Sequence, residues 1–146
     1  MKAVIFDIDG TLSIVGDRVK YLQQEPKDWD AFYEACDKDK PNLPIIKLCN
    51  SLYGDVQYVH HKFFLLTGRR EGVRDKTVKW LRKHGVSWDL LLMRPDGDYR
   101  HDIVLKPELI APRKITEAII FEDRDSMVKK WREMGYTCLQ VADGNF

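Results

Sequence analysis

The sequence is poor in the features that mark secreted, zinc-binding or membrane-spanning chains. It has only three cysteines, Cys36, Cys49 and Cys138, which are widely spaced and form no CxxC pair. An odd number of scattered cysteines argues against a disulfide framework or a structural zinc site, so we expect free thiols and a cytoplasmic protein. No apolar run approaches the roughly 18 residues of a membrane span, and the first ten residues turn acidic too soon for a signal peptide. We therefore expect no membrane partner.

An excess of charge of one sign is also missing. The chain has 24 Lys and Arg residues against 23 Asp and Glu residues, a formal net charge of +1. This balance excludes a uniformly basic nucleic-acid coat but allows a local basic groove. With 146 residues, 44% of them hydrophobic, and no repeats, the chain is typical of one folded unit. We expect a single domain over residues 1–146.

Short apolar segments alternate with helical patterns along the chain. This order predicts an α/β fold with a mostly parallel sheet. The predicted strands lie within 2–7, 57–66, 89–93, 117–122 and 136–141, and the predicted helices within 28–37, 44–53, 71–84 and 125–134. The expected architecture is a three-layer, Rossmann-like parallel sheet of about five strands, with a small helical insertion after the first strand near residues 16–45. A long loop is predicted over 94–101.

Carboxylates gather at the ends of two predicted strands. Asp7 and Asp9 close the first strand, followed by Gly10, and Glu122 and Asp123 close the fourth. Ligands bind at the carboxyl ends of parallel strands, so we expect the four carboxylates to converge at one edge. Such a group repels itself unless a hard cation lies within it, which favours Mg²⁺. A calcium loop or simple turn is the alternative for the first pair, but the EF-hand pattern fails and a turn does not explain the second pair.

Two further features lie near the same predicted edge. The second strand is expected to end at Thr67-Gly68, followed by Arg69, a combination that suits phosphate oxygens. Lys106 lies between the third and fourth strands. Taken alone, the tripeptide is equally typical of a surface turn, and the lysine of a solvated helix face. Their order along the chain and their shared position near one predicted edge of the sheet favour a functional role for them.

These residues together resemble the four motifs of the haloacid dehalogenase superfamily of phosphatases. The motifs are the FDIDGTL segment at 6–12, Thr67-Gly68-Arg69, Lys106 and Glu122-Asp123. The resemblance extends to the 3′-phosphatase domain of phage polynucleotide kinase/phosphatase, with Arg18 and Asp102 on further positions of that pattern and similarity through 128–146. It therefore also suggests a phage-encoded source. The sequence departs from the family at Glu122, which is usually Asp, and has no GxxxxGK[ST] kinase loop.

The resemblance implies a Mg²⁺-dependent phosphatase that forms an aspartyl-phosphate. In it, Asp7 is the nucleophile and Asp9 the general acid and base. Mg²⁺ is held by Asp7, the Asp9 backbone carbonyl and Asp123, with Glu122 close to the metal through a water. The transferring oxygens are held by Lys106 and Thr67. The implied substrate-binding residues are Thr11, Arg18, Gly68, Arg69 and Asp102, of which Asp102 would orient Lys106 or Arg69.

The substrate is less closely defined. Residues 69–106 contain ten basic and six acidic residues, which favours an anionic partner such as a phosphorylated nucleic-acid end or a nucleotide. Trp29, Phe32 and Tyr33 could stack on a base or form the core of the insertion. Removal of 3′-phosphate from polynucleotide or nucleotide ends is the first hypothesis. A 5′-mononucleotide or small-metabolite phosphatase is the alternative, and a non-catalytic phospho-ligand binding module a distant one. The sequence makes no prediction of oligomeric state.

Overall fold

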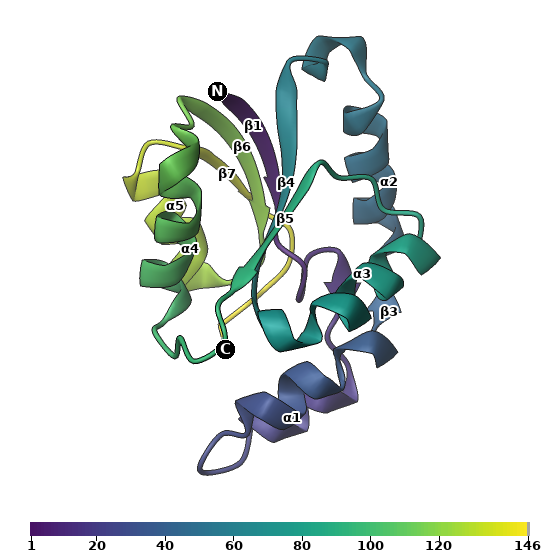
Figure 1. The fold of residues 1–146 in the computed structure, drawn as a ribbon, viewed down its shortest axis with the longest axis vertical. Helices are drawn as coiled ribbons and strands as arrows, with labels where there is room; N and C mark the ends of the chain where they lie inside the picture. The colour runs from purple at the N-terminus through teal and green to yellow at the C-terminus, as the bar shows by residue number, and fades with distance from the viewer. Residues whose placement is uncertain (146) are drawn as a thin grey trace.

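A five-stranded parallel sheet forms the centre of the molecule (Figure 1). The computed structural model describes residues 1–145, so Phe146, the last residue of the expected domain, lies outside the described residues. The strand order is β5-β4-β1-β6-β7. The strands are β1 (Lys2–Phe6), β4 (His61–Arg70), β5 (Leu90–Arg94), β6 (Glu117–Glu122) and β7 (Thr137–Gln140). The predicted Rossmann-like α/β fold is confirmed.

Helices cover both faces of this sheet, which explains why its strands are continuously apolar. Successive side chains of a strand point to opposite faces. Val4 and Phe6 belong to one hydrophobic cluster, with α2 (Leu43–Tyr53) and α3 (Arg74–Lys83). Ala3 and Ile5 belong to the other, with α4 (Asp102–Ile110) and α5 (Asp125–Glu133). In Figure 1 these two helix pairs lie on either side of the sheet.

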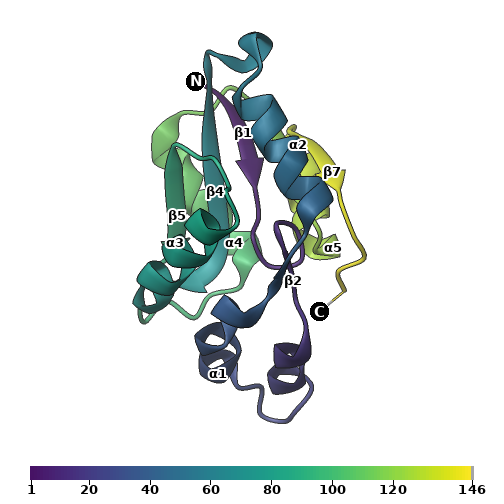
Figure 2. The ribbon, with the colours of Figure 1, turned by 90° about the vertical axis from the view of Figure 1, so that its right-hand side faces the viewer.

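The segment between β1 and α2 crosses the carboxyl ends of the strands. Near its two ends this segment forms a short antiparallel strand pair, β2 (Ser13–Ile14) with β3 (Lys40–Pro41). Between them lie the 3-10 turns η1 (Asp17–Leu22) and η2 (Cys36–Lys38) and the helix α1 (Trp29–Glu34). Figures 1 and 2 show α1 beyond the carboxyl end of β1. The insertion therefore lies directly over the edge where the acidic residues meet.

The aromatic residues of the insertion pack mainly against one another and the core. Phe32 and Tyr33 are buried, and Trp29 is half-buried against the same cluster. The Asp28 side chain caps α1 by accepting a hydrogen bond from the Ala31 amide at 2.9 Å. The hypothesis that these aromatic residues form the insertion's own core thus holds for Phe32 and Tyr33, whereas Trp29 is only half-buried.

The structure differs from the sequence prediction in the end of one strand and in the presence of one helix. The second predicted strand was expected to end at Thr67-Gly68, but β4 continues to Arg70, with an irregular register between Leu66 and Arg70. The helix α4 was not predicted, because its sequence contains Pro107 and has no clear amphipathic pattern. Both differences affect the site, since β4 and α4 carry five of its expected residues: Thr67, Gly68, Arg69, Asp102 and Lys106. Among residues 1–145, no helix has the length and apolar character needed to cross a membrane.

Candidate active site

Three buried carboxylates meet where β1 and β6 end side by side. Asp7 follows β1 directly, Glu122 is the last residue of β6, and Asp123 comes next. One oxygen from each of the three lies within 4.8 Å of the others. Parallel pairing of Phe6 with Phe121 sets this arrangement, because it brings the two strand ends to the same level. The cluster offers only oxygen ligands, which suits a hard divalent cation.

Lys106 supplies the positive charge of this cluster. It lies one turn into α4, and its Nζ donates to Oδ1 of Asp7 at 2.7 Å and to Oε2 of Glu122 at 2.8 Å. The lysine is 2% exposed. Burial opposes its charge, but Asp7 and Glu122 outweigh that effect and raise its pKa. Lys106 is therefore a fixed cation at neutral pH.

The carboxylates exceed the charge that Lys106 can balance. Burial, with Glu122 adding to it, raises the pKa of Asp7 well above its usual range, although Lys106 opposes the shift. Burial and Glu122 also raise the pKa of Asp123 to about 7. In both groups burial disfavours the charged form, and neighbouring carboxylates add to that effect. A divalent cation next to Asp7 and Asp123 would favour their charged forms, so these residues fit Mg²⁺.

Glu122 has a structural role in addition to its contact with Lys106. Its Oε1 accepts hydrogen bonds from the backbone amides of Asp123 and Arg124, at 3.1 and 3.3 Å. The carboxylate therefore fixes the turn that presents Asp123. This arrangement uses the longer side chain that distinguishes the sequence from the family's usual Asp.

Gly10 and Thr11 lie tightly against this cluster. Gly10 has a φ of +87°, and a Cβ placed on it would lie 2.1 Å from Oδ2 of Asp123. Only glycine can hold this backbone shape so close to a carboxylate. Thr11 is fully buried, and within the described residues its hydroxyl has no hydrogen-bond partner. Thr11 was expected to bind substrate, and that role stays a prediction.

Asp9 does not join the other three carboxylates, contrary to the expected convergence of four. Its carboxylate accepts hydrogen bonds from Arg69, at 2.6 Å from Nη2 and 3.0 Å from Nε, and forms a further ion pair with Arg18. Burial disfavours its charge, but Arg69 and Arg18 outweigh that effect and hold its pKa well below its usual range. Asp9 is therefore ionised, and it borders the same small cavity as Asp7 while its carboxylate is held by the two arginines.

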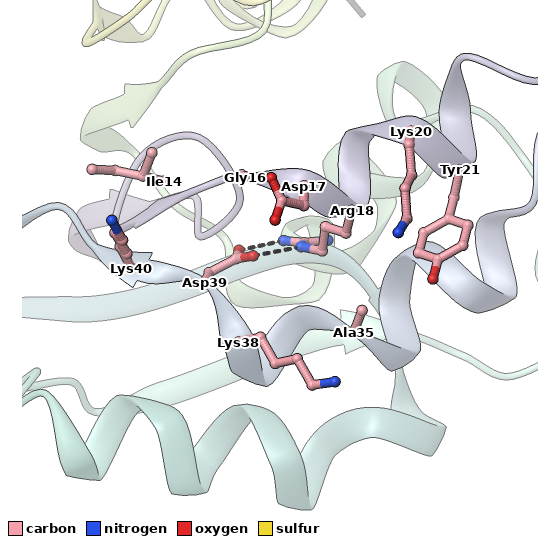
Figure 3. Close-up of a pocket in the computed structure, with 10 residues that line it drawn as sticks. All are labelled: Ile14, Gly16, Asp17, Arg18, Lys20, Tyr21, Ala35, Lys38, Asp39 and Lys40. Atoms are coloured by element: carbon pink, nitrogen blue, oxygen red, sulfur yellow. Dashed lines mark hydrogen bonds and ion pairs between the residues drawn. The ribbon is translucent and has the colours of Figure 1, made fainter.

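Arg18 and Arg69 were expected to grip the substrate phosphate, and the structure corrects this. Arg69 is fully buried and Arg18 is 4% exposed. Arg18 also donates to Asp39 through Nε at 2.7 Å and Nη2 at 2.6 Å, the pair drawn in Figure 3. Because both guanidinium groups are occupied by buried carboxylates, they position Asp9. Asp39, which the sequence analysis missed, completes the network.

A large surface hollow lies on the outer side of this network. It measures about 540 Å³ and is bordered by Lys20, Tyr21 and Lys38 (Figure 3). The Arg18–Asp39 pair forms its inner wall and separates it from Asp9. Asp7, Lys106 and Asp123 do not border it, so this hollow is not where the carboxylates meet.

Asp102 has partners other than the expected ones. Its carboxylate pairs with Arg94 at 2.5 Å and with Arg124 at 3.1 Å, instead of Lys106 or Arg69. Arg94 also donates to the Gly68 carbonyl at 2.9 Å. The sequence analysis missed Arg94 and Arg124. Arg124 could have been found from the sequence, because it directly follows the acidic pair Glu122-Asp123.

Thr67 and Gly68 reach the site through the extension of β4. Thr67 is fully buried, and its Oγ1 accepts a hydrogen bond from the Arg69 amide at 3.2 Å. Gly68 borders the catalytic cavity, and a Cβ on it would lie 2.7 Å from Oδ1 of Asp102. The absence of a side chain at Gly68 thus leaves room for Asp102.

The space enclosed by these groups is small. A cavity of about 20 Å³ lies between Asp7, Lys106 and Asp123 on one side and Phe32 and Tyr33 of α1 on the other. A single water molecule needs about 10–15 Å³. The insertion therefore covers the carboxylate cluster closely. The arrangement can hold a cation, present Asp7 as a nucleophile and keep Asp9 nearby as a proton acceptor.

Comparisons with known proteins agree with this geometry. Residues 1–146 match the family described as the polynucleotide kinase PNKP phosphatase domain. A chain in a structure of the Pnkp1/Rnl/Hen1 RNA repair complex is similar, with 33% identity and a TM-score of 0.82 over 99% of this chain and 43% of that one. A chain in another Pnkp1/Rnl/Hen1 complex has 33% identity and a TM-score of 0.80, over 99% of this chain and 47% of that one. The present chain thus spans less than half the length of each.

Proposed function

Because the chain belongs to the family of polynucleotide kinase PNKP phosphatase domains, and is a phosphatase of the haloacid dehalogenase type, we propose that it removes 3′-phosphate from nucleic-acid ends or nucleotides through an aspartyl-phosphate. The observation that carries the proposal is the cluster of Asp7, Lys106, Glu122 and Asp123 at the carboxyl edge of the sheet. Similarity to chains of RNA repair complexes supports a nucleic-acid end as the substrate.

The cluster fits one Mg²⁺ ion. Asp7 and Asp123 would hold it, because both are buried carboxylates whose pKa is raised by burial and by Glu122, and a cation would offset both effects. When bound, the ion supplies charge neutralisation between the nucleophile and the phosphate and polarises the phosphoryl group. Glu122 is committed to Lys106 and the following turn, so it acts on the metal site through Asp123.

In the first step, an oxygen of Asp7 attacks phosphorus while the bond from phosphorus to the nucleoside oxygen breaks. Lys106, 2.7 Å from Asp7, favours the ionised carboxylate, holds it in place and donates to the developing charge. Asp9 is ionised before substrate binds, but the arriving phosphate adds negative charge beside it and raises its pKa, so that Asp9 takes up a proton from solvent. Asp9 then passes this proton to the leaving oxygen.

In the second step, water attacks the phosphorus of the aspartyl-phosphate. Asp9, now deprotonated, accepts the proton of this water, and the bond between phosphorus and Asp7 breaks. Inorganic phosphate leaves, and the Asp7 carboxylate is restored. Arg18 and Arg69 hold Asp9 in one orientation through both steps, which is the role that their buried contacts indicate.

A rapid-quench experiment tests these assignments, using a 3′-phosphorylated oligonucleotide and nitrophenyl phosphate. Asp7→Asn should show no burst with either substrate, because no phosphoenzyme can form. Asp9→Asn should lose the burst with the oligonucleotide and keep part of it with nitrophenyl phosphate, whose leaving group needs no proton. General acid help is typically worth about 10²–10⁴-fold. A burst in Asp7→Asn with none in Asp9→Asn would mean that the two roles are reversed.

Substrate class is tested separately by phosphate release. The 3′-phosphorylated oligonucleotide, a 3′-mononucleotide and a 5′-mononucleotide are compared at equal concentrations. We expect release from the two 3′-phosphates and little from the 5′-mononucleotide. Preference for the 5′-mononucleotide would favour the alternative of a mononucleotide phosphatase and overturn the proposed substrate.

A further inference from the structure

A second hollow adjoins the catalytic cavity and has a different chemical character. It measures about 240 Å³, and we call it the Tyr99 groove, after the residue at its outer edge. Its other principal lining residues are Lys27, Trp29, Tyr33, Arg70 and Arg100. Tyr33, Asp102 and Arg124 border both the groove and the catalytic cavity, so the two spaces are adjacent.

The groove combines aromatic rings with an excess of positive charge. Five Lys and Arg residues line it against two carboxylates, but two of these cations have carboxylate partners: Arg70 pairs with Asp30, and Arg100 pairs with Asp98 and Glu108. Tyr99 is 76% exposed, an unusual fraction for an aromatic side chain, whereas Trp29 and Tyr33 stack on each other with ring centroids 5.8 Å apart. Positive grooves with exposed aromatic rings bind single-stranded nucleic acid, because phosphates meet the cations and bases stack on the rings.

The loop that carries Tyr99 is fixed before any ligand arrives. Arg94 donates from Nη1 to the carbonyls of Asp98 and Arg100, at 3.0 and 2.6 Å, and from Nε to Gly68 of β4. Arg70 of β4 lies with its guanidinium 4.7 Å from the centre of the Tyr99 ring. The ring is therefore held at a defined place beside the catalytic edge. Little conformational entropy of the loop is lost when a base stacks on the ring.

We infer that the Tyr99 groove binds the nucleotide that precedes the terminal phosphate, with its base on the Tyr99 ring and its phosphodiester near Arg70 and Arg100. The inference rests on the proposed function, since it places the terminal phosphate at Asp7. The groove is smaller than the roughly 300–1,000 Å³ of pockets that enclose a whole small ligand. It is open at the Tyr99 side, so a longer strand can continue outward. The preferred substrate is thus a strand of two or more nucleotides.

Binding measurements in the Asp7→Asn background test this inference without turnover. The probes are a 3′-phosphorylated mononucleotide and a 3′-phosphorylated trinucleotide, each as DNA and as RNA. We expect the trinucleotide to bind more tightly than the mononucleotide. Adding Tyr99→Ala should weaken trinucleotide binding about tenfold and remove the gain from chain length, since stacking on one aromatic ring is of that size. Tyr99→Phe, which keeps the ring, should retain the gain.

A charge control comes from the opposite end of α4. Arg113 is exposed in the turn η5 (Ala111–Arg113), so Arg113→Gln should change trinucleotide binding less than twofold, whereas Arg100→Gln should weaken it. Equal effects of these two variants, or a chain-length gain that survives Tyr99→Ala, would overturn the inference. A gain in affinity from chain length supports the inference, whether it occurs with both DNA and RNA or with only one of them.

Phosphate release from the same trinucleotide by the unaltered enzyme separates this inference from the proposed function. Tyr99-dependent binding without phosphate release would leave the groove in place and refute the reaction. Release of 3′-phosphate with no dependence on chain length or Tyr99 would leave the reaction in place and refute the groove.

Discussion

Lys106 and Asp7 are separated by 99 residues in the chain, yet Nζ of the lysine donates to Oδ1 of the aspartate at 2.7 Å. This contact joins the end of the first strand to α4 and places a permanent cation against the proposed nucleophile. Burial and the neighbouring carboxylates still raise the pKa of Asp7 and Asp123, which supports the proposal that a metal ion binds there.

Removal of the lysine charge should therefore destabilise the protein as well as inactivate it. Lys106→Met keeps the length of the side chain but leaves Asp7 and Glu122 without their buried partner. We expect a loss of about 3–5 kcal/mol in the free energy of unfolding without Mg²⁺, measured by urea denaturation. Lys129→Met, at a position that is largely exposed, serves as the matched control and should cost less than 1 kcal/mol. A Lys106→Met protein as stable as this control would contradict the analysis of the cluster.

Mg²⁺ should stabilise the folded protein through Asp123. At a concentration one hundred times the Kd, a bound ligand adds about 2.7 kcal/mol, which corresponds to a rise of several degrees in Tm. Asp123→Asn should lose most of this rise because it removes a metal ligand. Glu122→Asp should keep more of it, because a carboxylate remains. Calorimetry with and without Mg²⁺ measures both, and a larger rise in Asp123→Asn than in Glu122→Asp would mean that their roles are exchanged.

Asp9 should contribute to the loss of stability in acid. Its pKa in the folded protein lies well below its usual value of about 3.9, so the unfolded chain binds the proton more readily. The stabilisation is fully present above pH 4 to 5 and is lost as the pH falls toward the folded value. In Asp9→Asn, the free energy of unfolding should fall less steeply between pH 5 and pH 3, by up to about 1.4 kcal/mol per pH unit. Parallel curves for the two proteins would refute the Asp9 assignment.

The three cysteines should be unreactive in the folded state. Burial raises the pKa of Cys36, Cys49 and Cys138, to about 12 for Cys49 and about 11 for Cys138. Because the thiolate is the reactive form, iodoacetamide at pH 8 should modify none of them within a time that labels all three in urea. Mass spectrometry counts the labels. Rapid labelling of Cys49 in the native protein would show that its region opens easily.

The sheet and the acidic edge could be predicted because both depend on local patterns. Continuous apolar segments such as KAVIF mark strands covered on both faces, and Asp7 and Asp123 come directly after two of them. Parallel strands end at the same edge, so the meeting of these residues followed from sequence order alone. The prediction that Lys106 belongs to this edge rested on the family resemblance, since nothing in its own segment distinguishes it.

The network around Asp9 could not be predicted, because it depends on long-range pairing of very short elements. Asp39 reaches Arg18 only through the two-residue strands Ser13–Ile14 and Lys40–Pro41, which carry no recognisable pattern. Arg94 was missed for a similar reason. A single arginine at the end of a strand is usually solvent-exposed, and only the fold places it between Asp102 and the Gly68 carbonyl.

The close cover of the carboxylate cluster by Phe32 and Tyr33 has a kinetic consequence. A space of about 20 Å³ admits an ion or a water molecule, but it cannot admit a phosphate group. For the proposed reaction we therefore expect a displacement of the short helix that carries these two rings, once when the phosphate enters and once when it leaves. We expect this displacement to limit the maximal rate, which should then fall as solvent viscosity rises.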